Sequence, residues 1–552
     1  MLNYREDNKK RGWRLALDFA KSHAITLLIT TVAFIVIVVS LFVLFSNRSH
    51  ETAKYRKGVN YKNADTIYLR TGEIPDMNTL KNTNPDLKSI NNLLYDSLFK
   101  VNENLNIYPS LVEDYTTDKD KGECKITIRK DAVFSDGSDV TVKDIRYSIS
   151  VIKREGEDGV YFPYIDKIRY VDAEDDKNIT VYFKSKDDAA LDNLIFPIFK
   201  YGAKQGDDFF VGGGPYKLSN AVSGNKLKFE PNTEYKKGVA RNKIELEIGK
   251  SSDMDIGLIT MDALTAKMYR NSNVISMIKN RNVKSEKIVS PELEYVGFNC
   301  RKGKITSDKK IRKAIGNFID KEEIIEDNYG GAAVSSKTLF FPNFLKNSAE
   351  KDKKADKNKG YQEKTKRKSE SKKILSKLKN KKDSEGMFKD ASGNLISLKI
   401  LTREGFIPEN DTAIYLVQML KKLGFASEII KVNPDEYNKK LKEGDFDIYI
   451  GSISTDERFN LSPLFDKDNY AGFSDKKTIE KVKSLETCLT AEEQKKAFSA
   501  LQRELEEENV YVSLCYKTYS FIHVETLSKD IEPTFFDVFR GCNTWSWKKI
   551  VS

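Results

Sequence analysis

Residues 125–145 read KITIRKDAVFSDGSDVTVKDI, and this stretch carries three structural signals in succession. Residues 125–129 alternate polar and apolar side chains with period two, which predicts a strand. Residues 134–137, FSDG, supply the residue types of a tight turn. Thr141 and Asp144 have the spacing of a capping box, which predicts a helix beginning at Val142. A strand, a turn and a capped helix in this order predict an α/β fold.

The second half of the chain repeats this pattern. Apolar side chains recur at helical spacing in residues 311–319, 413–423 and 498–505, and residues 446–450 alternate like a strand. Gly424 is placed to end one helix, and Asp320 and Thr490 are placed to cap the starts of two others. Because 552 residues are too many for one hydrophobic core, we expect two or more lobes.

Positive charge is concentrated in one segment. Residues 351–383 hold 14 lysines and Arg367 against five acidic residues, a net charge of +10 out of +11 for the whole chain. Such a block predicts a solvated, mobile insertion. Contact with an anionic wall polymer or with lipid headgroups is the functional alternative. Nucleic-acid binding is disfavoured, because Tyr361 is the one aromatic residue among the lysines.

A run of 22 residues without a charged side chain, from Ala24 to Phe45, predicts a membrane anchor. As a helix it would span roughly 33 Å, enough for a bilayer core. A cleavable signal peptide is the competing interpretation, but it requires small residues where this run ends in LFVLF. We therefore expect residues 1–23 to be cytoplasmic, 24–45 to be an uncleaved transmembrane helix and 46–64 to be a linker, although positive residues flank both ends.

The residue sets of catalytic and metal sites are missing from the sequence. Three histidines and five cysteines without a C-x-x-C pair provide no zinc or iron–sulfur ligand set. No G-x-S-x-G, H-E-x-x-H or P-loop motif occurs. His523 lies in an apolar, strand-like context that favours a structural role. We predict no enzymatic activity, no cofactor and no metal, and buried free thiols in preference to a disulfide.

Several short segments, taken in order, resemble those of a known family. They are LYDSL at 94–98, IYPSLV at 107–112, the pieces ITIR, FSDG and VKDI of the stretch 125–145, GGPY at 213–216, GFN at 297–299, IRKAI at 311–315 and IDK at 319–321. Together they resemble the oligopeptide- and dipeptide-binding type of extracellular solute-binding protein, over residues 65–549.

The resemblance implies an α/β, two-lobed clamp of the periplasmic-binding-protein type with an extra subdomain, here preceded by one transmembrane helix. Lobe I would comprise residues 65–92, the subdomain 93–205, a second part 206–299 and a return 511–552. Lobe II would comprise residues 300–510, including the lysine-rich insertion 351–383. A ligand would be enclosed when the lobes close, and backbone groups would bind an extended peptide much as an added strand does.

Candidate ligand-binding residues follow from the same resemblance. They are Asn82, Thr83, Asn84 and Thr260 on lobe I, and Gly451, Ser452, Ser454, Asp456 and Arg458 on lobe II. Some family members hold the peptide's amino terminus with the second acid of an asp-x-x-asp motif. If Asp456 matches the first acid, Phe459 occupies the second position, so Asp456 or Glu457 would have to replace it. Arg458 could clamp a carboxylate or pair with either acid.

These features predict the extracellular substrate-binding component of an ABC importer, anchored in the cell membrane by one helix. Its expected partners are a peptide or related small solute and the permease subunits, with no nucleic acid, and it is expected to be a monomer. A surface receptor or sensor with the same clamp and no dedicated permease is the alternative function. Genes for permease and ATPase subunits beside its own would distinguish the two.

Overall fold

The computed structural model describes residues 65–205, 209–219, 225–250, 254–260, 264–269, 283–336, 338–342, 344–345, 357–378, 380–528 and 531–547. All of them belong to one compact unit. The predicted anchor 24–45 and its flanks 1–23 and 46–64 lie outside the described residues. Among the residues that are described, no helix is both long enough and apolar enough to cross a bilayer.

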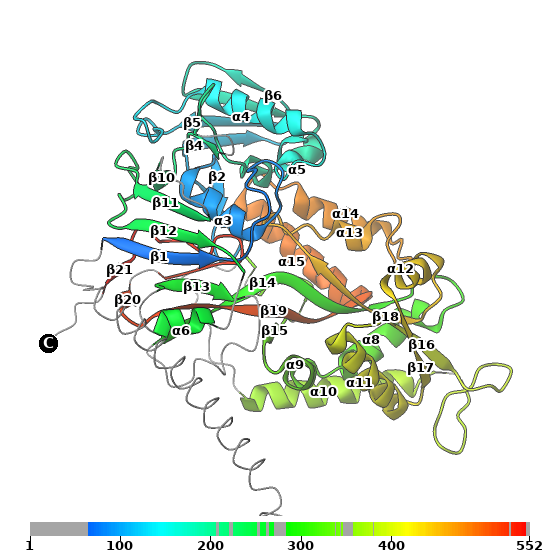
Figure 1. The fold of residues 1–552 in the computed structure, drawn as a ribbon. Coiled ribbons are helices and arrows are strands. Elements are labelled where there is room, and N and C mark those ends of the chain that lie inside the picture. The colour runs from blue at the N-terminus through cyan, green and yellow to red at the C-terminus, as the bar shows by residue number, and fades with distance from the viewer. Residues whose placement is uncertain are drawn as a thin grey trace, which may run out of the picture. The chain divides into compact units, whose positions relative to one another are not determined.

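An eleven-stranded mixed sheet forms the framework of this unit (Figure 1). Its strands follow the order β10 (Tyr216–Leu218), β11 (Lys226–Pro231), β12 (Lys243–Ile248), β1 (Thr66–Thr71), β13 (Ala266–Tyr269), β19 (Tyr511–Val524), β14 (Val283–Phe298), β18 (Ile448–Ser454), β16 (Ser397–Arg403) and β17 (Ala426–Val432), with β15 (Ala333–Ser335) beside β19. β1 runs parallel to β12 and β13, and β16 runs parallel to β17 and β18. Between these two parallel groups, β19 and β14 are antiparallel to each other.

The stretch 125–145 adopts the predicted elements. Residues 123–128 form β5 (Glu123–Ile128), part of an antiparallel sheet with β4 (Val112–Asp118), β7 (Asn178–Phe183) and β6 (Ile168–Ala173). The turn is closed by a hydrogen bond from the Gly137 N–H to the Phe134 carbonyl, with Gly137 at φ +83°. α4 (Val142–Glu155) follows, and the Asp144 carboxylate accepts a hydrogen bond of 2.8 Å from the Thr141 N–H. Short strand pairs complete this part: β2 (Phe99–Val101) with β3 (Ile107–Pro109), β8 (Lys204–Gln205) with β9 (Phe209–Phe210), and β20 (Leu527–Ser528) with β21 (Ser546–Trp547).

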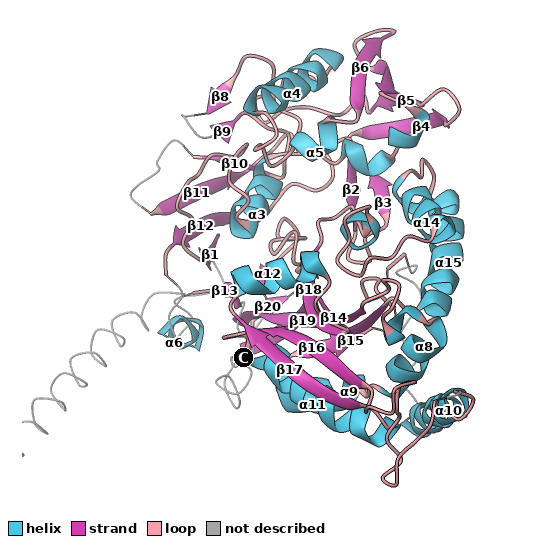
Figure 2. Ribbon diagram, turned by 90° about the vertical axis from the view of Figure 1, so that its right-hand side faces the viewer, coloured by secondary structure: helices cyan, strands magenta, loops and turns pink. Residues whose placement is uncertain are grey.

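The predicted helix boundaries of the second half are also confirmed. Gly424, at φ +94°, ends α11 (Ile407–Leu423), and the Thr490 hydroxyl accepts from the Glu493 N–H at the start of α15 (Ala491–Glu508). Figure 2 shows α9 (Lys321–Tyr329) and α11 along one face of the sheet that contains β16 and β17. The helices are α3 (Pro85–Leu94), α5 (Phe162–Ile165), α6 (Met254–Thr260), α8 (Lys309–Phe318), α9 (Lys321–Tyr329), α10 (Lys357–Leu375), α11 (Ile407–Leu423), α12 (Pro434–Glu443), α13 (Ser462–Phe465), α14 (Lys476–Glu486) and α15 (Ala491–Glu508).

Three clusters of buried apolar side chains divide the unit into two lobes. The first cluster draws on residues 67–288 and 521–545, and we call this part lobe I. The other two draw on residues 293–516, and we call that part lobe II. Leu489 packs in the lobe I cluster and Leu105 in a lobe II cluster, so each is an exception to the division. β14 and β19 both pass from one lobe to the other, since each contributes side chains to the lobe I cluster and to the lobe II clusters.

The lysine-rich segment differs from the prediction. Its residues 357–375 form α10, which lies against α8. Ser371 and Leu375 are buried, and Glu370 pairs with Lys313 of α8 at 3.3 Å. Lys364 and Lys368 both approach the buried Asp320 carboxylate. The expectation of a mobile insertion is therefore wrong for this helix, because one of its faces has apolar and ionic partners; residues 351–356 lie outside the described part.

Candidate ligand site

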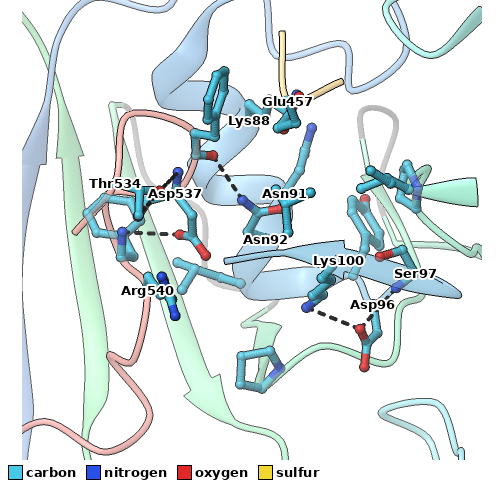
Figure 3. A pocket seen from close by; sticks show the side chains of 18 of the residues that line it. Lys88, Asn91, Asn92, Asp96, Ser97, Lys100, Glu457, Thr534, Asp537 and Arg540 are labelled. Carbon is cyan, nitrogen blue, oxygen red and sulfur yellow. Dashed lines mark hydrogen bonds and ion pairs between the residues drawn. The ribbon is translucent and has the colours of Figure 1, made fainter. Parts of the chain in front are cut away.

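A cavity of about 300 Å³ opens beside α3 in lobe I (Figure 3). Its walls come from lobe I, mainly from α3, the β2–β3 pair and the loop 532–543, and from one described lobe II side chain, Glu457. This volume is at the lower end of the range for small-molecule sites, about 300–1,000 Å³. The polar and charged residues of its lining include Lys88, Asn91, Asn92, Asp96, Ser97, Lys100, Asn102, Glu457, Glu532, Thr534, Asp537, Arg540 and Asn543, and the aromatic ones Tyr95, Tyr108, Tyr161, Tyr235, Phe536 and Phe539.

Glu457 links the two lobes at this cavity. It follows β18 of lobe II and is 7% exposed. The Lys88 ammonium, from α3, lies 2.5 Å and 2.6 Å from its two carboxylate oxygens. The hydroxyl of Tyr164, from α5, donates a hydrogen bond of 2.9 Å to the same carboxylate. Burial and the neighbouring negative charge raise the pKa of Tyr164 well above its ordinary value, so the phenol remains a donor.

Asp456 and Arg458 pair with each other instead of facing the cavity. The Arg458 guanidinium donates to the Asp456 carboxylate at 2.8 Å and 2.5 Å. It also donates to the Pro163 carbonyl at 2.9 Å and lies 4.6 Å from the centre of the Tyr164 ring. Of the interpretations left open for Arg458, pairing with Asp456 is the one observed. Arg458 therefore contributes a second contact between lobe II and lobe I.

The opposite side of the cavity is a buried charge cluster. Asp96 accepts from the Ser110 hydroxyl at 2.5 Å and pairs with Lys237 at 2.8 Å and Lys100 at 3.1 Å. Burial acts to raise the pKa of Asp96, but the two ammonium groups outweigh it and hold the pKa below the ordinary value. The Asp96 charge is thus compensated within lobe I.

Two further acids have raised pKa values. Burial raises the pKa of Asp537 to about 6, against the opposing charges of Lys100 and Arg540. Burial likewise raises the pKa of Asp192 to about 7. Of the lobe II charges, that of Arg458 lowers the pKa of Asp192, and those of Asp456 and Glu486 raise it. The protonation state of Asp192 therefore depends on how the two lobes meet.

The lobe I candidates have local structural contacts. Asn84 caps α3, where its side chain accepts from the Asp86 N–H at 2.8 Å. Asn82 accepts from the Asn84 N–H at 2.9 Å, and Thr83 between them is exposed. Thr260 is the last residue of α6, and its side chain is not among those described. None of Asn82, Thr83 or Asn84 lines the cavity.

The lobe II candidates lie along β18. Gly451 is buried against the rings of Tyr295 and Tyr449. Ser452 is exposed and accepts from Arg403 at 3.0 Å, and Ser454 is exposed. Phe459, which stands at the family's second acid position, packs in the lobe II core beside Phe344, with ring centres 4.9 Å apart. Glu457, two residues earlier, is the acid of this segment that lines the cavity.

The partners of Glu457 could not be found in the sequence. The sequence offers Glu457 as an alternative to Asp456, but its partners Lys88 and Tyr164 carry no motif. They lie 369 and 293 positions away along the chain and meet Glu457 only because the lobes come together. Within the described residues, no group of three or more His, Cys, Asp or Glu side chains is arranged to hold a metal ion. His523 is buried in β19, with Nδ1 2.8 Å from the Val524 carbonyl.

Two α/β lobes with a small-molecule cavity where they meet define a solute-binding protein. Residues 106–472 match the model of the bacterial extracellular solute-binding proteins, family 5, and the chain belongs to this family. The proteins of this family serve ABC importers by binding substrate and are not enzymes.

Individual relatives are distant but match nearly the whole chain. The oligopeptide-binding protein AppA of Bacillus subtilis is 23% identical over 503 residues, which cover 85% of this chain and 89% of AppA. The unliganded open form of MppA, a periplasmic murein tripeptide-binding protein, has a TM-score of 0.72 at 17% identity and covers 88% of this chain and 98% of its own. A nickel ABC transporter protein from Bacillus halodurans has a TM-score of 0.71 at 16% identity, covering 87% and 100%. At these identities the structural matches establish the fold.

Proposed function

We propose that this protein is the membrane-anchored, extracellular binding component of an ABC importer that captures short peptides, or a related small solute, and delivers them to a permease. The observation that carries this proposal is the position of Glu457. A lobe II carboxylate that completes a lobe I cavity makes the cavity dependent on closure of the lobes. A ligand that contacts both sides would therefore favour the closed arrangement.

A peptide is the favoured ligand class for two reasons. β18 pairs with β16 only at Ile448 and Tyr449, so the backbone of residues 450–454 is not paired on that edge by β16. An extended ligand could pair there, which would give the candidates Gly451, Ser452 and Ser454 a role through their backbone groups. In addition, relatives matched over most of the chain carry the name oligopeptide-binding protein.

The membrane anchor belongs to this proposal as well. Residues 24–45 have the length and composition of a spanning helix, and a tethered binding protein would be held close to its permease. Fractionation of cells that express the full chain should place the protein in the membrane, and external protease should remove the part from residue 65 onward. Release of the full chain into the medium would contradict the anchor.

Ligand capture is tested by mass spectrometry of the purified full chain under native conditions. We expect co-purified peptides of a few residues that are lost on unfolding. A thermal shift with a defined tripeptide library should then be positive, since a ligand that binds only the folded state raises its stability. Glu457→Gln should reduce the shift, while Glu480→Gln, on α14 and outside the cavity, should leave it unchanged. An empty cavity and no shift with any library member would contradict the peptide assignment.

A further inference from the structure

Lys88 occupies the position at Glu457 that a ligand's amino group would need. Its ammonium lies within 2.6 Å of both carboxylate oxygens, and one of these oxygens also accepts from Tyr164. The side chain of Glu457 is 6% exposed, so this carboxylate has little access to water. A buried carboxylate requires a compensating charge, and here the protein supplies it.

The surroundings of the Lys88 ammonium resemble a site built for a cation. The nitrogen lies 5.9 Å from the centre of the Tyr164 ring and 5.8 Å from that of Phe536. A carboxylate with two aromatic rings at this distance is the arrangement that binds ligand ammonium groups. Figure 3 shows Lys88 and Glu457 meeting at one end of the cavity. The structure therefore has a cation-binding position beside Glu457, and the Lys88 side chain of the same protein occupies it.

The other acids near the cavity are no better placed to receive a free amino terminus. Asp456 is held by the Arg458 guanidinium, and Asp96 by the ammonium groups of Lys100 and Lys237. Burial raises the pKa of Asp537 and the positive charges of Lys100 and Arg540 act to lower it, and Glu532 lies 3.9 Å from the Arg540 guanidinium. An ammonium group brought into the cavity would therefore meet cations beside each of these described carboxylates.

We propose that Lys88 is a built-in counter-ion that makes the site select ligands without a free amino terminus, such as peptides whose amino group is acylated. This inference rests on the proposed function, because it specifies which peptides the site accepts. A neutral amide can enter beside the Lys88–Glu457 pair without leaving an unpaired charge. A free ammonium group would have to displace Lys88 from Glu457 or remain uncompensated, and both are unfavourable.

The test compares two probes on the full chain: a defined tripeptide library with free amino termini, and the same library N-acetylated. Retention is measured by native mass spectrometry and affinity by titration. Wild-type protein should bind the acetylated library about tenfold more tightly or better, which corresponds to about 1.4 kcal/mol. Lys88→Met keeps the apolar stem but removes the ammonium, and it should reverse the preference.

Matched variants separate the charge effect from damage to the fold. Lys88→Arg retains a cation and should keep the wild-type preference. The double variant Lys88→Met with Glu457→Gln has neither charge and should again accept acetylated peptides. Lys81→Met, on an exposed lysine whose ion pair is with Glu155, should change nothing.

The outcomes distinguish this inference from the proposed function. Wild-type protein that prefers free amino termini, or an acetyl preference that Lys88→Met leaves intact, would overturn the role of Lys88 while peptide binding stands. Failure of every form to bind either library would overturn the peptide assignment and the role of Lys88 with it.

Discussion

At the scale of single residues, the structure reassigns several side chains. The resemblance makes Gly451 a candidate for ligand contact, but a side chain at this position would not fit. A Cβ there would approach Tyr295 Cζ to 2.8 Å and Tyr449 Cε2 to 2.9 Å. The glycine is thus needed for close packing of two aromatic rings in lobe II, whatever its backbone contributes to binding.

Gly451→Ala should therefore lower the free energy of unfolding by about 1–3 kcal/mol, the usual cost of overpacking a core. Chemical denaturation followed by circular dichroism measures this loss. Ser454→Ala, on the same strand but exposed, should stay within about 0.5 kcal/mol of wild type. Equal stability of the two variants would show that the rings can move apart freely.

Asp192 should make stability depend on pH. Its folded-state pKa of about 7 lies above the ordinary value of 3.8, so between these values the folded chain holds a proton that the unfolded chain has lost. The contribution of this proton to the free energy of unfolding is complete below pH 4 and is lost as the pH rises through 7. Asp192→Asn should thus raise the melting temperature relative to wild type at pH 8 but hardly at pH 4.5.

Asp187→Asn is the control for this pH effect, because Asp187 is exposed and lies five positions from Asp192. The melting temperatures of both variants and of wild type, measured at pH 4.5 and at pH 8, test this prediction. A difference between Asp192→Asn and wild type that is the same at pH 4.5 and pH 8 would rule out titration of Asp192 as its source.

At the scale of elements, periodic segments were predicted well and the lysine-rich segment was not. Helices 309–318, 407–423 and 491–508 carry regular apolar stripes and explicit caps, so local sequence defines them. α10 has few apolar residues, and charge composition alone indicated a mobile chain. Its position depends instead on Leu375 in a lobe II core and on ion pairs with Lys313 of α8 and with Asp320, which composition does not reveal.

Leu375→Ala should accordingly destabilise lobe II by about 2–5 kcal/mol, since Leu375 is 4% exposed within that core. Lys373→Ala, on the exposed face of the same helix, should change stability by no more than about 0.5 kcal/mol. Denaturant titration of both variants provides the comparison. A neutral Leu375→Ala would mean that α10 does not pack as a fixed part of the lobe.

At the scale of the whole described unit, a few polar contacts join the lobes beyond the shared strands β14 and β19. Glu457 bonds to Lys88 and Tyr164, Arg458 to the Pro163 carbonyl, and Lys119 to the Thr487 carbonyl at 2.6 Å. Each joins a residue of lobe I to one of lobe II. Polar contacts of this kind can exchange with water at modest cost, which suits a clamp that must open.

Weakening these contacts should favour the open arrangement. Lys88→Met with Glu457→Gln removes the ion pair, so the ligand-free protein should have a larger radius of gyration by small-angle scattering than wild type. Lys81→Met is again the control. An unchanged radius of gyration would show that the shared strands, and not the Glu457 contacts, hold the lobes together.

The sequence by itself determined the α/β class, the helix caps, the strand–turn–helix start and the family, because each depends on residues close together in the chain. Only the tertiary structure decided which acid enters the cavity and what compensates it. Asp456, Glu457 and Phe459 are neighbours in sequence, but their side chains face Arg458, the lobe I cavity and the lobe II core respectively. The physical reason is that a buried charge is stable only beside groups that compensate it, and the groups that compensate Glu457 come from the other lobe.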